Sequence, residues 1–249
     1  AARTRAANIA GMAADAVAKA VKLPDGTPAR VVWSPVLIDG EKQADVVANQ
    51  FLDAGVDALI CTPDTWAFPQ LTTLSLLARF PAGTPLNITC GNSAPRPGVV
   101  YAHALNGALA QSGILAHLNV GTWPDTGARP RMTDATAEAL IDWCYAALAR
   151  VGLRGRRVVV FGHDSMGMET ALAHVLPTRE ILGLEITRLD MKLLADMLDK
   201  GAYDAAERAR LRKWFDRHVG DRLELPDEAS GERADQSLAR YLILRDLMG

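Results

Sequence analysis

Residues Val158–Glu169 read VVVFGHDSMGME. A run of apolar residues ends at Gly162 in a short polar loop, and a helical pattern follows over 168–174. A strand, a tight turn and a helix in this order are typical of an open α/β sheet, where ligands bind beyond the carboxyl ends of the strands. The sequence therefore predicts a binding loop at residues 162–167.

The same alternation extends along the whole chain. Strands are predicted at 31–34, 57–62, 86–90, 114–120, 157–161 and 184–189, and helices at 4–22, 42–54, 69–80, 98–111, 134–150, 168–174, 191–219 with a break near Gly201, and 237–248. Strands separated by single helices pair in parallel through right-handed crossovers. The predicted fold class is α/β, with two helix-flanked, mainly parallel-sheet (Rossmann-like) lobes.

A polar stretch, GTWPDTGARPRMT over 121–133, concentrates Gly, Pro and charge and is typical of a domain boundary. The first α/β domain is expected at 1–121 and the second at 122–249. The chain begins inside a helix, without an opening strand, and it ends without a closing strand or a cap. The first domain is therefore expected to be incomplete at its amino end, and the second at its carboxyl end.

Composition narrows the class of protein. The 249 residues carry a net charge of -2, which argues against a nucleic-acid binder. Cys61, Cys90 and Cys144 are odd in number and widely spaced, as in reduced cytoplasmic proteins. No apolar run approaches the roughly 20 residues that span a bilayer. We expect a cytoplasmic protein that binds neither nucleic acid nor membrane, and we interpret the charged 207–217 stretch as a solvated helix face.

The 162–167 loop leaves several interpretations open. A hydrolase would use Ser165 as nucleophile, but the motif for that chemistry is G-x-S-x-G, and Gly162 lies one residue too far upstream. Asp164 or Ser165 could instead only cap the following helix. His163 could bind substrate or donate a proton, or it could make a structural hydrogen bond.

Two further loops also follow predicted strands. In Cys61–Pro69, Trp66 could offer its flat apolar face to the C–H side of a sugar, or it could simply pack within the loop. The loop Gly91–Gly98 contains Asn92, and the three loops could share one edge of a sheet. The candidate substrate-binding residues are Trp66, Asn92, His163 and Ser165.

Metal and nucleotide motifs are not found in the sequence. The histidines, which are His103, His117, His163, His174 and His218, show neither H-E-x-x-H spacing nor a nearby cysteine pair. The glycines form neither G-x-G-x-x-G nor a P-loop. No metal ligand and no catalytic residue is predicted within this chain.

Four segments in order resemble the L-fucose isomerase family. They are Trp66 after Thr62-Pro63, Asn92 with Arg96-Pro97-Gly98-Val99-Val100-Tyr101, Ser165-Met166-Gly167 after a strand, and Leu244-Arg245-Asp246-Leu247-Met248. The segment Asp64–Pro69 departs from the family pattern, and so does His163-Asp164. The substrate could therefore be L-fucose, D-arabinose or another similar aldose.

The resemblance implies a manganese-dependent aldose–ketose isomerase that works through an enediol and assembles as a homo-oligomer, a hexamer, with active sites shared between subunits. It implies that this chain supplies mainly the first two α/β domains, that the Mn²⁺ ligands lie beyond it, and that Trp66 lines the sugar pocket of an adjacent subunit. The alternative is a non-catalytic sugar- or metabolite-binding α/β protein.

Overall fold

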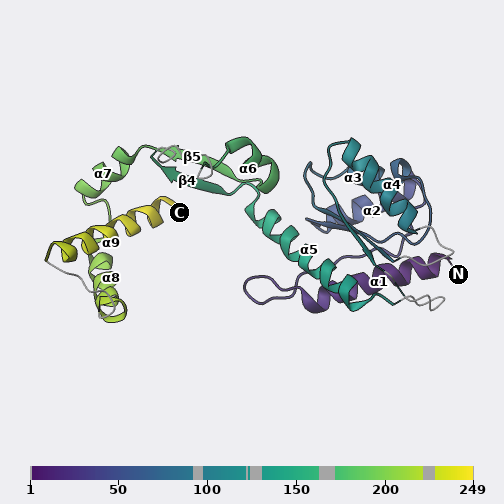
Figure 1. Ribbon diagram of the computed structural model, residues 1–249, viewed down its shortest axis with the longest axis horizontal. Coiled ribbons are helices and arrows are strands. Elements are labelled where there is room, and N and C mark those ends of the chain that lie inside the picture. The colour runs from purple at the N-terminus through teal and green to yellow at the C-terminus, as the bar shows by residue number, and fades with distance from the viewer. Residues whose placement is uncertain are drawn as a thin grey trace. The chain divides into compact units, whose positions relative to one another are not determined.

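The computed structural model describes residues 2–91, 98–121, 123, 131–162, 172–220 and 228–248. The chain divides into two compact units, Ala1–Arg154 and Gly155–Gly249 (Figure 1). Each unit contains parallel strands and helices, which confirms the α/β class.

The first unit is built on a parallel sheet with the strand order β1-β2-β3. The strands are β1 (Leu59–Cys61), β2 (Leu86–Gly91) and β3 (His117–Gly121). Leu59 is in register with Leu86 on β2, and Gly91 at the end of β2 is in register with Gly121. Because β2 is the central strand, it is buried on both faces, and its polar residues Asn87 and Thr89 are buried with the apolar ones.

One face of this sheet is covered by α2 (Glu41–Asp53), η1 (Pro69–Leu71), α3 (Thr73–Leu77) and α4 (Gly98–Gln111) (Figure 1). Ala44, Val47 and Ala48 form the buried stripe of α2, at the three- and four-residue spacing of a helix face. They pack in one cluster with Ile88 of β2 and Leu105 of α4.

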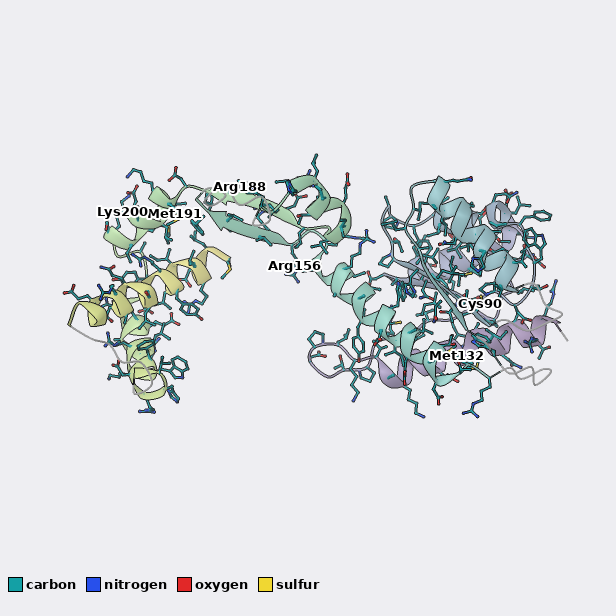
Figure 2. The ribbon with its side chains drawn as sticks, in the orientation of Figure 1. Cys90, Met132, Arg156, Arg188, Met191 and Lys200 are labelled. Atoms are coloured by element: carbon teal, nitrogen blue, oxygen red, sulfur yellow. The ribbon has the colours of Figure 1, made fainter. Side chains whose placement is uncertain are left out.

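The other face is covered by α1 (Ala2–Ala20) and α5 (Asp134–Leu153). Ile9 and Val17 of α1 pack with Leu140 of α5 and with Trp123, which follows β3. Met132 closes this second cluster against α1, where its backbone N–H contacts the Met12 sulfur at 3.2 Å (Figure 2). The sheet thus lies between two apolar layers.

The second unit contains β4 (Arg157–Phe161) and β5 (Glu185–Leu189), paired in parallel, with α6 (Val175–Leu182) between them in sequence. The remaining helices are α7 (Met191–Asp199), α8 (Ala205–His218) and α9 (Glu228–Met248). Asp190 and Asp204 cap α7 and α8 by accepting backbone N–H bonds, which satisfies donors that a helix leaves free.

The predicted strand at 31–34 was wrong, because this segment has no regular structure. Pro28 and Pro35 flank it and cannot donate to a ladder, and Val31 packs against the α1 cluster without pairing. The Trp33 carbonyl accepts from the Gln50 side chain at 3.3 Å. The helix predicted at 237–248 begins nine residues earlier, since α9 starts at Glu228.

The helix predicted at 168–174 lies mostly outside the described residues. Residues 172–174 are not helical, and α6 starts at Val175. The break near Gly201 is confirmed, because Gly201 adopts a positive φ of 62° between α7 and α8. The first unit runs to Arg154, because α5 packs on α1 and β3 within it, and the domain boundary at 121 stays a prediction. Over the described residues no helix is both long and apolar enough to cross a membrane.

Candidate functional site

The candidate site lies at the carboxyl edge of the first sheet. Because the three strands are parallel, the chain leaves β1 at Cys61, β2 at Gly91 and β3 at Gly121 on the same edge. The loop 62–68 after β1 and Trp123 after β3 are described there, while Asn92 lies outside the described residues.

A buried ion pair fixes the loop after β1. Arg5 of α1 donates through Nε to both carboxylate oxygens of Asp64, at 2.9 and 3.2 Å. The two side chains are only 4% and 5% exposed. Gly98, the first residue of α4, lies so close that an added Cβ would be 2.8 Å from the Pro63 carbonyl oxygen. The loop is therefore held between the starts of two helices.

Trp66 projects from this fixed loop and remains 43% exposed. Its ring makes edge-on contacts with Phe68 and Tyr101, with centroid distances of 6.0 and 6.5 Å. Tyr101 is buried, and its hydroxyl is hydrogen-bonded to Thr72 at 2.9 Å and Thr73 at 2.8 Å. Trp66 therefore presents a braced, partly exposed aromatic surface.

Tyr101, which contacts Trp66, and the thiols of Cys61 on β1 and Cys90 on β2 are not poised for proton transfer at neutral pH. Burial raises the pKa of Tyr101 to about 12 and the pKa of the Cys90 thiol to about 12. Desolvation likewise raises the pKa of Cys61 to about 11, against the opposing hydrogen bond with Thr73. These groups stay protonated and neutral, which fits a packing role and not a nucleophilic one.

Of the predicted binding residues, the structure describes Trp66 alone; Asn92, His163 and Ser165 lie outside the described residues. Gly162, the residue before His163, lies within the described part of the chain. Gly162 has a φ of 85°, and its N–H donates to the Leu189 carbonyl at 2.8 Å. The positive φ of Gly162 is compatible with the predicted turn, whose other residues lie outside the described ones, and the roles of His163 and Ser165 stay predictions.

Sequence reasoning missed the Arg5–Asp64 pair, although a signal was present. Arg5 lies four residues before Ile9, and Ile9 lies four before Ala13, so Arg5 occupies the buried stripe of α1. A basic residue on the apolar face of a helix requires a buried partner. The identity of that partner, 59 residues away, could not be read from spacing.

A polar ladder between the sheet and α5 was also missed. The buried Thr89 hydroxyl donates to the Asn87 side chain at 2.5 Å, and Asn119 Nδ2 donates to the Thr89 oxygen at 3.2 Å. Asn119 Nδ2 also donates to the Thr136 carbonyl of α5 at 3.0 Å. These bonds satisfy the polar atoms of buried side chains that interrupt the apolar runs of the sequence. They also connect β2, β3 and α5.

No three His, Cys, Asp or Glu side chains gather to form a metal site within the part of the chain that the structure describes. The carboxylate of Asp64, two residues before Trp66, is bonded to Arg5 and is not free to bind a divalent ion. The described residues thus do not fit the Mn²⁺ that the resemblance implies, and no step through a metal is assigned to them.

A parallel sheet flanked by helices, with a half-exposed tryptophan in the loop after its first strand, defines an α/β protein. Residues 1–155 match the family model described as L-fucose isomerase, first N-terminal domain. The chain belongs to the L-fucose isomerase family, a family of sugar isomerases.

Similar curated proteins are named L-fucose isomerase. The chain is 28% identical to L-fucose isomerase of Streptococcus pneumoniae (strain Hungary19A-6) over 249 residues and 27% identical to that of strain Taiwan19F-14 over 248 residues. Both alignments cover 97% of this chain and 41% of the relative. The chain thus spans less than half the length of these relatives.

Proposed function

We propose that this chain forms the amino-terminal α/β part of an aldose–ketose isomerase that acts on L-fucose, D-arabinose or a similar aldose. Family membership and the L-fucose isomerase relatives support the reaction class. The observation that carries the part played by this chain is the braced Trp66, which is 43% exposed beside the buried Arg5–Asp64 pair.

In this proposal the chain contributes to substrate binding. The exposed ring of Trp66 stacks on the C–H face of the sugar, as aromatic side chains in polar pockets do. Phe68 and Tyr101 hold the ring in place, so sugar binding loses less side-chain conformational entropy. Asn92, His163 and Ser165 are proposed to contact sugar hydroxyls.

The reacting centre belongs, in the same proposal, to parts of the enzyme that this chain does not include. The metal, proposed to be Mn²⁺, is held there, and the substrate pocket is shared between subunits of a homo-oligomer, proposed to be a hexamer. A cytoplasmic location is supported by the cysteines, since Cys61, Cys90 and Cys144 are all free thiols.

The test is an isomerase assay on the gene product that carries this sequence. Supplied with Mn²⁺ and with L-fucose or D-arabinose, it is expected to form the corresponding ketose, and chelation is expected to abolish the activity. Sugar binding by calorimetry without ketose formation would overturn the proposal in favour of a sugar-binding protein. If the protein hydrolyses an ester and Ser165→Ala abolishes that activity, the result would instead support the hydrolase interpretation.

A further inference from the structure

The loop that carries Trp66 is held from both faces of the first sheet. Residues 62–68 connect β1 to η1 without helix or strand, so contacts with other elements decide their conformation. Asp64 accepts two bonds from Arg5 of α1, and a Cβ added to Gly98 of α4 would be 3.1 Å from Asp64 Cα. Because α1 and α4 cover opposite faces of the sheet, a shift of the loop toward either face disturbs one of these contacts.

Burial makes the Arg5–Asp64 pair sensitive to the position of the loop. A buried ion pair contributes little net stability, because the loss of hydration offsets the attraction between the charges. A loop conformation that separates the two side chains, however, takes two hydrogen bonds from charges that water does not reach. The pair therefore disfavours other conformations of the loop.

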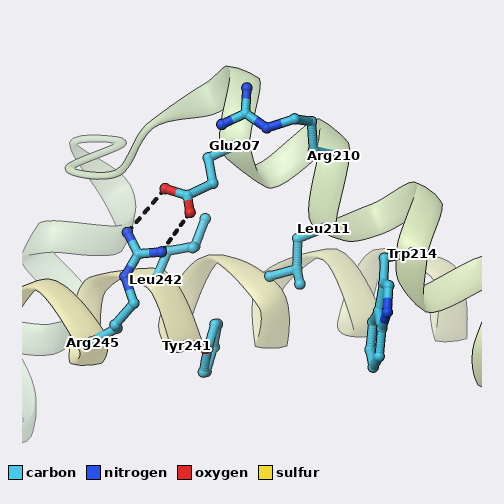
Figure 3. A pocket seen from close by; sticks show the side chains of 7 residues that line it. All are labelled: Glu207, Arg210, Leu211, Trp214, Tyr241, Leu242 and Arg245. Carbon is cyan, nitrogen blue, oxygen red and sulfur yellow. Dashed lines mark hydrogen bonds and ion pairs between the residues drawn. The ribbon is translucent and has the colours of Figure 1, made fainter.

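An ion pair in the second unit provides the contrast. Arg245 of α9 donates two bonds to the Glu207 carboxylate of α8, at 2.5 and 2.9 Å (Figure 3). The two side chains are 40% and 32% exposed, so water can solvate both charges when the pair separates. The same number of bonds therefore constrains α8 and α9 less than the Arg5–Asp64 pair constrains its loop.

Two contacts at the far end of the loop connect its position to the Trp66 ring. The Thr72 hydroxyl donates to the Phe68 carbonyl at 2.9 Å, which ties the end of the loop to the start of α3. The same hydroxyl is hydrogen-bonded to the Tyr101 hydroxyl, and the Tyr101 ring lies edge-on to Trp66. Trp66 thus stands between two held points of the loop, Asp64 and Phe68.

We infer that Arg5 and Asp64 are positioning residues for sugar binding, which hold the loop so that the Trp66 ring is in place before the sugar arrives. This inference rests on the proposed function, in which Trp66 stacks on an aldose. Arg5 and Asp64 do not touch the sugar themselves, because both side chains are buried and bonded to each other. A loop that is ordered in advance loses less conformational entropy on binding.

The test is a double-mutant cycle on the gene product that carries this sequence, assayed with Mn²⁺ and whichever of L-fucose and D-arabinose the parent protein converts. Asp64→Asn is expected to raise KM about tenfold and to change kcat by less than about twofold, the pattern of lost substrate binding. In the Trp66→Ala background, Asp64→Asn is expected to raise KM by less than about twofold more, because Asp64 acts through Trp66. A purely structural role of Asp64 would instead give additive effects.

A direct measurement of the loop accompanies the kinetics. Hydrogen exchange followed by mass spectrometry is expected to be about tenfold faster over residues 62–68 in Asp64→Asn than in the parent protein. Arg5→Lys is the second variant, because it keeps the buried cation and loses the guanidinium Nε that bonds both carboxylate oxygens. It is expected to raise KM about threefold, and it tests the inference even where Asp64→Asn does not fold.

Two controls separate positioning from general effects of substitution. Glu207→Gln removes a carboxylate from the exposed pair with Arg245, and it should leave KM unchanged. Leu109→Ala opens a cavity at a fully buried residue near the end of α4. It should lower the midpoint of thermal unfolding, but it should change neither KM nor hydrogen exchange over 62–68.

The outcomes distinguish this inference from the function on which it rests. A parent protein that forms no ketose overturns the proposed function and the inference together. With an active parent protein, the inference alone is overturned if Asp64→Asn and Arg5→Lys leave KM unchanged or if exchange over 62–68 is not faster in Asp64→Asn. It is also overturned if Asp64→Asn has its full effect in the Trp66→Ala background, or if Leu109→Ala raises KM as much as Asp64→Asn does.

Discussion

Arg5 and Asp64 form an ion pair with almost no contact with water, since their side chains are 4% and 5% exposed. Asp64→Asn removes the carboxylate charge that accepts from the buried Arg5 guanidinium. We expect the free energy of unfolding to fall by about 3–5 kcal/mol, measured by urea denaturation.

The matched control is Asp39→Asn, the same chemical change at the exposed pair with Arg3, whose side chains are 80% and 43% exposed. Its expected cost is only about 0–1 kcal/mol, because surface ion pairs contribute little. Similar costs for Asp64→Asn and Asp39→Asn would show that burial of the Arg5–Asp64 pair does not set its energetic importance.

Trp66 is the residue on which the proposed sugar contact depends. Trp66→Ala removes the exposed ring, and sugar affinity is expected to weaken by about 1–3 kcal/mol, as aromatic burial suggests. Trp33→Ala serves as control, because Trp33 belongs to the same unit and is 44% exposed, close to the 43% of Trp66. Calorimetry with L-fucose compares the two variants, and unchanged affinity in Trp66→Ala would reduce this residue to a packing role.

At the scale of the element, β3 and α5 meet at Gly121, where a side chain has no room. A Cβ there would collide with the Thr136 hydroxyl, which is itself hydrogen-bonded to Thr133 at 2.8 Å. Gly121→Ala should therefore lower the free energy of unfolding by about 1–3 kcal/mol, the typical cost of overpacking.

Gly107 provides the contrasting case within α4. It is exposed, and an added Cβ would meet nothing within 4 Å. Gly107→Ala should stabilise the protein by about 0.5–1 kcal/mol, because alanine loses less conformational freedom on entering a helix. Thermal or urea unfolding of both variants tests the comparison, and destabilisation by Gly107→Ala would contradict it.

Elements with strong periodicity were predictable from sequence, and those decided by tertiary contacts were not. The helix predicted at 98–111 coincides with α4, because its apolar residues repeat at helical spacing between Pro97 and Gly113. The apolar run at 31–34 looks like a strand locally, but pairing depends on a neighbour that spacing does not specify. In the candidate site, the loop sequence indicated Trp66, whose binding role stays a prediction, but spacing could not indicate the Arg5–Asp64 pair, which joins distant segments.

At the scale of the whole molecule, the position of α5 determines where the first unit ends. Leu140 and Cys144 of α5 complete the cluster around Ile9 and Val17, so a unit that stops at 121 would expose that apolar face of α1. We propose that the independently stable unit is 1–154 and not the predicted 1–121.

The two fragments, 1–154 and 1–121, distinguish these boundaries. Residues 1–154 are expected to unfold cooperatively on heating, followed by circular dichroism, with a midpoint close to that of the first transition of the full chain. Residues 1–121 are expected to show no cooperative transition and to bind a hydrophobic dye, because Ile9, Val17 and Val21 lose the partners that bury them. A cooperative transition of equal midpoint in the shorter fragment would mean that α5 adds nothing to the core, and the boundary would return to 121.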